Sequence, residues 1–212
     1  MIPKDFITEW QDYAPWAGTS QVEQDLVISR ALVELFSVPE LSEKLLFRGG
    51  TALYKLYLTP AARYSEDIDL VQADANPIGG TLDRLRSVLD PWLGEPRRQF
   101  KQGRTNLVYR YQSEGEPPAK MKLKIEIDTR EHFSQLGTVA MPFNVNSRWF
   151  AGTADVHTFE LDELLGTKVR ALYQRKKGRD LFDVWYALQS GKADRDRILS
   201  FAQDFNGTSS KP

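Results

Sequence analysis

Apolar residues recur at helical spacing in several stretches of the chain, and this pattern predicts amphipathic helices. The stretches are residues 21–36, 51–58, 81–93, 161–175 and 181–189. We expect Thr19 or Ser20 to cap the first helix, with Glu23 completing a capping box. Pro60 is expected to stop the second helix, because proline has no backbone N–H to donate.

Short apolar runs and period-two alternation predict strands between these helices. The candidates are residues 45–47, 65–71, 107–112 and 121–128. Residues 113–119 contain two consecutive prolines and a glycine, so we expect a loop there. Helices and strands mixed in this order predict an α/β or α+β protein.

The same pattern suggests how the chain is divided. We expect a helical segment at residues 1–43 and a core containing the strands at residues 44–158. A mainly helical lobe is expected at residues 159–204, and an unstructured tail at residues 205–212.

Composition narrows the chemistry. The 212 residues include no cysteine and only two histidines, which excludes disulfides, a cysteine nucleophile and a Cys-ligated metal. No segment approaches the run of about 18 apolar residues that a membrane span needs, and the N-terminus does not resemble a secretory signal. We therefore expect a cytoplasmic protein.

The net charge of −1 does not indicate a nucleic-acid binder, but the bases are clustered. Residues 168–179 carry six bases and no acid. A smaller cluster consists of Arg97, Arg98, Lys101 and Arg104. Such clusters suggest a local anionic partner such as phosphate, and the alternative is a solvated helix face.

Asp67 and Asp69 are two positions apart on a predicted strand, so their side chains share one face. Two adjacent carboxylates repel each other unless a cation lies between them. Mg²⁺ commonly uses one or two carboxylates together with substrate phosphates. The alternative is an exposed strand bearing two solvated acids.

The sequence Gly49-Gly50-Thr51 stands at a predicted strand-to-helix turn, sixteen residues before Asp67. Glycine lets a backbone approach a phosphate closely, and a helix start offers free N–H groups. Thr51 adds a hydroxyl. Together with the aspartates, the turn predicts a phosphate cradle beside a metal site.

A third carboxylate is available on the strand at residues 121–128. Glu126 and Asp128 share a face, and we favour Glu126 for a two-metal or metal-plus-base site. The alternative is that these acids pair with Lys122 and Lys124.

The predicted C-terminal helices supply cations. Lys168, Arg175 and Arg179 would lie roughly on one helix face, opposite an apolar side formed by Leu165, Val169, Leu172 and Tyr173. Asp180 and Asp183 could share a face at the start of the next helix. The alternatives are an N-cap role for Asp180 and pairing of Asp183 with a nearby arginine.

Four motifs, in this order, resemble one known family. They are residues 46–53 with the Gly-Gly-Thr turn, residues 63–69 with an R-x-S-x-D-x-D pattern, residues 124–126, and Lys168 followed by R-D-x-x-D at residues 179–183. This set, over about residues 44–188, is similar to the AbiEii-type nucleotidyltransferases of the polymerase-β-like superfamily, which include the MenT toxins.

The resemblance implies a bilobed α+β fold, with a small mixed-sheet lobe and a mainly helical C-terminal lobe. It also implies transfer of a nucleoside monophosphate from an NTP with Mg²⁺ or Mn²⁺, an RNA acceptor such as tRNA, and a cognate antitoxin in a phage-defence (abortive infection) system.

The family's roles can be carried onto matching residues. Asp67 and Asp69 would bind metal, with Glu126 as the third ligand. Gly49, Gly50, Thr51, Ser65 and Arg179 would hold the nucleotide. Lys168 would neutralise phosphate charge, and Asp183 would support catalysis or position Lys168.

Two other functions stay open on the sequence. The acceptor could be a protein hydroxyl or a small molecule, or the chain could bind a nucleotide without turnover. The intact pair Asp67 and Asp69 argues against the second of these.

Overall fold

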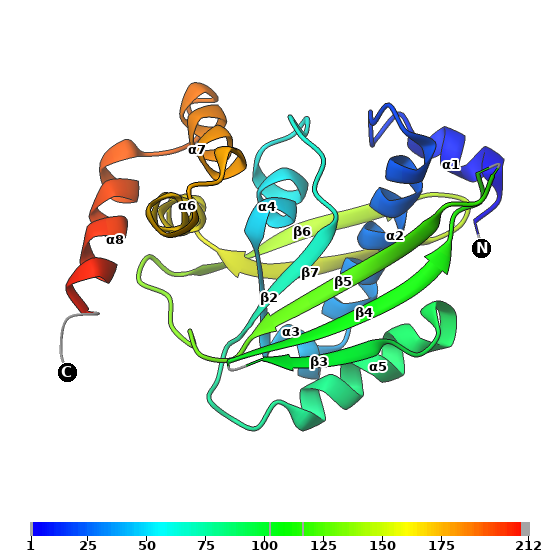
Figure 1. Ribbon diagram of the computed structural model, residues 1–212, viewed down its shortest axis with the longest axis horizontal. Coiled ribbons are helices and arrows are strands. Elements are labelled where there is room, and N and C mark those ends of the chain that lie inside the picture. The colour runs from blue at the N-terminus through cyan, green and yellow to red at the C-terminus, as the bar shows by residue number, and fades with distance from the viewer. Residues whose placement is uncertain (1, 102, 116, 209–212) are drawn as a thin grey trace.

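The computed structural model describes residues 2–101, 103–115 and 117–208, with side chains to residue 203. The N-terminal part contains α1 (Lys4–Trp10), α2 (Thr19–Phe36), α3 (Pro39–Ser42), β1 (Leu45–Arg48), α4 (Gly49–Ala52), the π-helical turn η1 (Leu53–Tyr57) and β2 (Asp67–Gln72). The remainder contains α5 (Gly79–Leu93), β3 (Arg97–Lys101), β4 (Arg104–Gln112), β5 (Lys120–Asp128), β6 (Thr138–Asn146), β7 (Ala151–Phe159), α6 (Leu161–Arg175), α7 (Gly178–Gln189) and α8 (Arg195–Thr208). The α+β prediction is confirmed (Figure 1).

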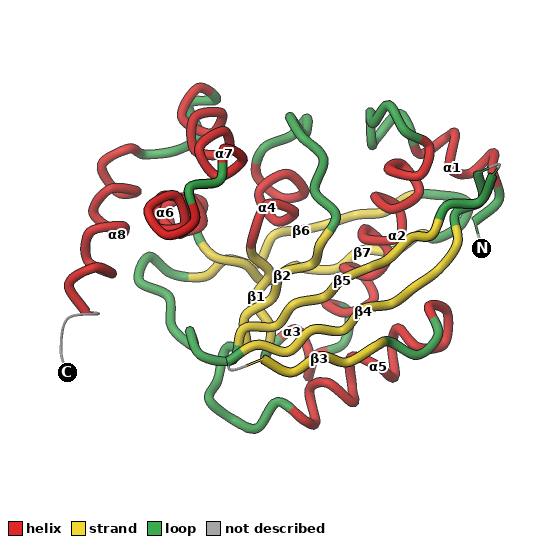
Figure 2. The backbone as a smooth tube through the Cα atoms, viewed as in Figure 1, coloured by secondary structure: helices red, strands yellow, loops and turns green. Residues whose placement is uncertain are grey.

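A seven-stranded mixed sheet organises the molecule, in the order β3-β4-β5-β2-β1-β7-β6 (Figure 2). β2 runs parallel to β5, and β1 runs parallel to β7, whereas the other neighbours are antiparallel. The central position of β2 places its residues beside both β1 and β5. The predicted strands at 45–47, 107–112 and 121–128 correspond to β1, β4 and β5.

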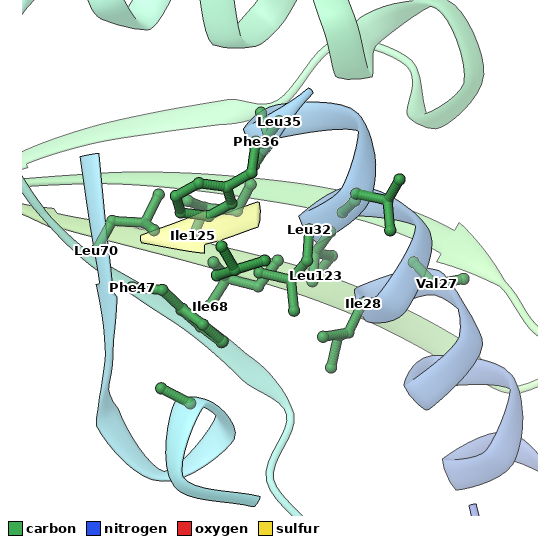
Figure 3. Packing of buried hydrophobic residues seen from close by; sticks show 14 of the residues in the cluster. Val27, Ile28, Leu32, Leu35, Phe36, Phe47, Ile68, Leu70, Leu123 and Ile125 are labelled. Carbon is green, nitrogen blue, oxygen red and sulfur yellow. The ribbon is translucent and has the colours of Figure 1, made fainter. Parts of the chain in front are cut away.

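Helix α2 packs against one face of the sheet and forms the centre of the core. Ile28 and Leu32 from the helix meet Phe47, Ile68 and Ile125 from three strands (Figure 3). All five side chains are fully buried. Burial of this apolar surface, at roughly 25 cal/mol per Å², is the main term that holds the helix on the sheet.

Helix α2 is buried on more sides than its apolar stripe predicts. Its Asp25 is also buried, and its carboxylate accepts hydrogen bonds from Trp10, Trp16 and Lys55. A buried carboxylate is tolerable only when it is paired in this way. The polar face of α2 therefore carries a network that fixes α1 and η1 against the helix.

The start of α2 differs from the predicted cap. Gly18 is the N-cap, and its backbone N–H donates to the side chain of Gln21 at 3.3 Å. Thr19 and Ser20 are the first residues of the helix, so their predicted capping role, and that of Glu23, is wrong. Glu23 instead points inward and accepts a hydrogen bond from the backbone of Glu114.

The hairpin β6–β7 was not predicted from the sequence. β6 alternates in burial along its length but contains Pro142, which lowered its strand signal. β6 forms the edge of the sheet, where a residue without an N–H can be accommodated. β7 joins the sheet beside β1, with Thr158 donating its hydroxyl hydrogen bond to the Phe47 carbonyl.

Helices α6, α7 and α8 gather at one end of the sheet (Figure 1). Buried Phe201 of α8 packs against α6 at Gly166, where an added Cβ would come within 2.3 Å of the ring. Anchored there, α8 continues to Thr208, so residues 205–208 of the expected tail are helical. The rest of that expected tail, 209–212, lies outside the described residues. No helix in the described part of the chain is long and apolar enough to cross a membrane.

The apolar side predicted for α6 is only half correct. Leu165 is fully buried, but Tyr173 is 79% exposed. The C-terminal part of α6 extends beyond the elements that cover its first turns, so the helical period continues in the sequence without a surface to pack against.

Candidate active site

Two glycines let side chains approach the end of β1 closely. Gly49 has a φ of +84°, a region that side-chain-bearing residues rarely adopt. A Cβ at Gly49 would lie 2.2 Å from a carboxylate oxygen of Asp69, and one at Gly50 would lie 2.6 Å from Nη2 of Arg63. The turn is therefore glycine-rich because β2 and the segment before it press against its backbone.

The two hydroxyls predicted to hold phosphate lie together but differ in exposure. Thr51 Oγ1 lies 2.8 Å from Ser65 Oγ and donates to the carbonyl of Asp67 at 2.5 Å. Thr51 is only 1% exposed, so its hydroxyl holds α4 against the start of β2. Ser65 and Gly50 both line a polar cavity of about 510 Å³, which is the candidate active site. The predicted cradle is thus formed by Gly50 and Ser65, with Thr51 behind them.

The acidic residues lie on neighbouring parallel strands. In the register of β2 and β5, Asp67 is opposite Lys124 and Asp69 is opposite Glu126. Burial raises the pKa of Asp69, and the charges of Asp67 and Glu126 raise it further, while Arg48 and Lys168 oppose the shift. Such concentrated negative charge favours a bound cation.

The third carboxylate is less available for metal than the sequence suggested. Glu126 lines the cavity, but its oxygens lie 2.7 Å from Lys124 and 3.2 Å from Arg104. Asp128 is 5% exposed and pairs with Arg48 at 3.0 Å. The described residues contain no group of three or more His, Cys, Asp or Glu side chains placed to hold a metal ion. Of the two alternatives, only Glu126 lines the main cavity.

The remaining donors still suit a hard divalent cation. Asp67 and Asp69 supply oxygen ligands, and both line the cavity in which a triphosphate would add its own oxygens. Burial is the largest cause of the raised pKa of Asp69, and the adjacent charges of Asp67 and Glu126 add to it. A divalent ion bound to Asp67 and Asp69 would relieve that repulsion between carboxylates. Two aspartates, rather than a complete protein cage, are therefore available here as oxygen ligands for such an ion.

Lys168 is buried between two aspartates of α7. Its Nζ lies 3.2 Å from a carboxylate oxygen of Asp180 and 3.2 Å from one of Asp183. Asp180 also accepts two hydrogen bonds from Arg175 at 2.9 Å. Burial would raise the pKa of Asp180, but the Arg175 hydrogen bonds and the Lys168 charge outweigh it and hold this pKa below its usual value. Asp180 is not the N-cap of α7, since that position is Lys177.

Asp183 is a connecting residue and does not line the cavity. It is fully buried, accepts two hydrogen bonds of 2.6 Å from Arg63, and accepts one of 2.8 Å from Tyr54. It thereby ties α7 to the segment that precedes β2 and to η1. Asp183 does pair with an arginine, as one alternative predicted. The partner is Arg63, which is distant in sequence.

A polar cavity of about 510 Å³ brings these groups together. Of the predicted residues, it is lined by Gly50, Ser65, Asp67, Asp69, Glu126, Lys168 and Arg179. The wall also contains Arg175, which was predicted among the cations of the C-terminal helices. Its other residues have no individual role predicted from the sequence: Arg63, Tyr64, Glu66, Arg104, Lys124 and Lys177. Two of these six could have been found from the sequence, because Arg104 and Lys177 belong to the two basic clusters.

A second cavity of about 320 Å³ adjoins the first. The two share Asp69, Glu126 and Lys168, and the second adds Gly49 and Arg170. Asp69 and Glu126 therefore lie between two spaces with cationic walls, whereas Asp67 lines only the first. Such an arrangement can hold a triphosphate on one side and admit a second reactant on the other.

Comparisons with known proteins agree with this geometry. The family model described as "Nucleotidyl transferase AbiEii toxin, Type IV TA system" matches residues 30–210. None of the curated proteins matches this chain significantly.

Among solved structures, the MenT4 nucleotidyltransferase toxin of Mycobacterium tuberculosis is similar, with 18% identity, a TM-score of 0.68, and coverage of 95% of this chain and 69% of the other. JHP933 from Helicobacter pylori has 19% identity, a TM-score of 0.58, and coverage of 89% and 75%. An antigenic nucleotidyltransferase-like protein from Paracoccidioides brasiliensis has 18% identity, a TM-score of 0.52, and coverage of 88% for both chains.

The structural likenesses, at these identities, establish a shared fold. The family match extends over most of the chain and includes every predicted site residue from Gly49 to Asp183. Seven of these residues line one polar cavity: Gly50, Ser65, Asp67, Asp69, Glu126, Lys168 and Arg179. The family match identifies an enzyme that transfers nucleotidyl groups. The chain belongs to the AbiEii family of nucleotidyltransferase toxins, of type IV toxin–antitoxin systems.

Proposed function

We propose that this enzyme transfers a nucleoside monophosphate from an NTP to a hydroxyl of an RNA acceptor, with tRNA as the first candidate, in a reaction that depends on Mg²⁺ or Mn²⁺. The observation that carries the proposal is the cavity in which Asp67 and Asp69 face a wall of cations from α6 and α7. Because NTPs and tRNA are cytoplasmic, we place the reaction in the cytoplasm.

Different residues would contact the bound phosphates and the departing pyrophosphate. Gly50 and Ser65 lie where a phosphate can meet backbone and hydroxyl groups. Lys168, Arg175 and Arg179 supply positive charge for the departing pyrophosphate, and preorganised charge of this kind lowers the barrier to transfer. Asp180 and Asp183 hold Lys168 in place, so that little reorganisation is needed when charge develops.

The acceptor hydroxyl bonds to the α-phosphorus, and the bond from that phosphorus to the β-bridging oxygen breaks. We assign Asp67 and Asp69 to hold the divalent ion. Bound there, that ion would supply charge neutralisation at the phosphates. We assign Glu126, opposite Asp69, to accept the hydroxyl proton.

Modification of tRNA would stop translation, which accounts for a toxin paired with an antitoxin. In a cell, growth arrest on phage infection would give the abortive-infection phenotype. We propose this defence role as the biological consequence of the transfer reaction.

The test is transfer of label from each of four α-³²P NTPs to total cellular RNA, with wild type and Asp69→Asn. Asparagine keeps the size of the side chain that packs against Gly49, so the variant should fold. We expect one NTP to label a tRNA-sized band with wild type only, and expect EDTA to abolish the label. Label on protein alone would exclude the RNA acceptor, and absence of any label would favour a nucleotide-binding module without turnover.

A further inference from the structure

One face of the sheet beside the active site is basic and exposed. On β4 and β5, Leu107, Tyr109, Leu123, Ile125 and Ile127 are fully buried on the core side. The alternate residues point to the opposite face, and in Figure 1 no helix of the described residues crosses in front of these two strands. The bases on this open sheet face are Arg97, Lys101, Arg104, Arg110, Lys120, Lys122 and Lys124.

The open sheet face leads directly to the catalytic carboxylates. Lys120, Lys122 and Lys124 follow one another on β5 at about 7 Å intervals, given the rise of a strand. In the parallel register with β2, Lys124 lies opposite Asp67. This row of bases therefore ends opposite the residue that we assign to the metal, where Lys124 is paired with Glu126 at 2.7 Å.

Two of these bases are placed where they repel each other. Arg110 on β4 is directly opposite Lys122 on β5. Like charges directly opposite in a sheet are destabilising. Within the part of the chain that the structure describes, neither residue forms an ion pair, and both are exposed. An anion between them would relieve the repulsion.

A groove of about 610 Å³ marks the same place. Its lining contains three bases, Arg110, Lys120 and Lys122, together with Glu66, Tyr111, Gln112 and Met121. Glu66 also lines the active-site cavity, so the groove and the cavity are neighbours. An extended ligand in the groove would reach the active site.

The other basic cluster is less free to bind RNA. In residues 168–179, Lys168 is buried with Asp180 and Asp183, Arg170 pairs with Glu131, and Arg175 pairs with Asp180. Lys177 and Arg179 line the active-site cavity. We therefore assign this cluster to the triphosphate and not to the RNA acceptor.

We propose that the open sheet face, centred on Arg110 and Lys122, docks the phosphate backbone of the RNA acceptor and directs its reactive hydroxyl toward Asp67 and Asp69. The proposal rests on the function proposed above. Among the described residues, this face of β3, β4 and β5 presents no aromatic side chain, and Tyr111 lines the groove from the other side of β4. Docking would therefore depend on backbone charge and shape more than on base identity.

The experiment measures label transfer to unfractionated tRNA by wild type, by Arg110→Glu/Lys122→Glu, and by a control with the same change in net charge, Lys44→Glu/Arg195→Glu. Lys44 and Arg195 are exposed and lie away from the groove. We expect the first variant to raise the KM for tRNA at least tenfold. Its slope of log KM against log salt should fall by about 1 to 2, since each lost phosphate contact removes about 0.7 to 0.9.

The affinity for NTP alone should stay within twofold in both variants, and the control should keep the wild-type KM for tRNA. An unchanged KM in the groove variant, or an equal rise in the control, would overturn the docking surface while leaving RNA transfer intact. Failure of wild type to label any RNA would instead overturn the proposed function itself. If the charge reversal prevents folding, Arg110→Gln/Lys122→Gln replaces it, with an expected threefold or greater rise in KM.

Discussion

Individual residues of the active site are fixed by contacts that a motif alone does not describe. Gly49 is required by its positive φ and by the carboxylate of Asp69, which lies where a Cβ would project. Asp183, which the motif suggests as catalytic, is buried and joins Arg63, Tyr54 and Lys168. At the residue scale, these contacts fix the positions of the charged groups in the site.

Gly49→Ala should destabilise the protein and displace Asp69. Both the positive φ and the 2.2 Å approach oppose a Cβ, so we expect a loss of about 2 kcal/mol or more in the free energy of unfolding. Urea denaturation measures this loss, and nucleotidyl transfer should fall with it. Gly80→Ala is the matched control, because a Cβ there meets nothing within 4 Å. Equal stability of the two variants would show that the close approach is unimportant.

Asp183→Ala should cost more stability than loss of an exposed site residue. Removal of one partner from a buried ion pair typically costs about 3–5 kcal/mol, because the remaining charges are left unpaired. Arg179→Ala removes an exposed base that lines the active-site cavity, and it should change stability by less than about 0.5 kcal/mol while lowering transfer. Thermal unfolding and transfer rates separate the two effects. A small change in stability for Asp183→Ala would show that its contacts contribute little to folding.

Elements are set by what packs against them as much as by their own pattern. Helix α2 has an apolar stripe, yet Glu23, Gln24, Asp25 and Ser29 on its other sides are buried too. Gln24 donates hydrogen bonds to the backbone carbonyls of Glu66 and Lys122, so α2 holds the segments that enter β2 and β5. The helix therefore aligns the two strands that carry the carboxylates.

Glu23 should make folding depend on pH. Burial raises its pKa to about 7 from an ordinary value of 4.5. A carboxyl with a raised folded-state pKa favours folding most at low pH, and this contribution is lost as the pH rises from about 4.5 through 7. Glu23→Gln keeps the shape and removes the titration.

We therefore expect Glu23→Gln to be more stable than wild type at pH 8, by as much as about 3 kcal/mol, and to differ little from it below pH 4.5. Denaturant unfolding of both proteins across this pH range measures the difference. A stability difference that does not change with pH would show that Glu23 titrates as an exposed carboxyl.

The whole molecule forms its site between the sheet and the C-terminal helices. Asp67 and Asp69 come from β2, the cations from α6 and α7, and the acceptor surface that we propose from β4 and β5. The Arg63–Asp183 pair joins the sheet side to the helical side at 2.6 Å. Ligands that contact both sides should therefore stabilise the entire fold.

NTP with Mg²⁺ should raise the thermal unfolding temperature. A ligand at 100 times its Kd adds about 2.7 kcal/mol to stability, which corresponds to several degrees for a chain of this size. We expect EDTA to remove most of this shift, and we expect Asp67→Asn/Asp69→Asn to abolish the part that depends on metal. Differential scanning fluorimetry with each NTP measures it. An identical shift with and without EDTA would contradict the assignment of these aspartates to a metal.

Much of the site could be predicted from the sequence, because its motifs are local. A carboxylate pair at i and i+2 on a strand must share a face, and Gly-Gly after a buried strand must form a tight turn. Asp67, Asp69 and Gly50 do line one cavity, and their roles toward metal and phosphate stay predictions. The strand carrying Glu126 was also predictable, since Leu123, Ile125 and Ile127 alternate with polar residues.

Other features depend on residues that are distant in sequence, and only the tertiary structure decided them. Asp183 was assigned to the site on its motif, but its partner Arg63 lies 120 positions away. The exposure of Tyr173 depends on where the elements that cover α6 end. Lys124 lies beside Asp67 because β5 and β2 are neighbours in the sheet. The hydrophobic period of a strand does not specify which strands lie next to it. The sequence by itself determined the local chemistry, whereas long-range packing decided which charges are neutralised and which are left to bind a substrate.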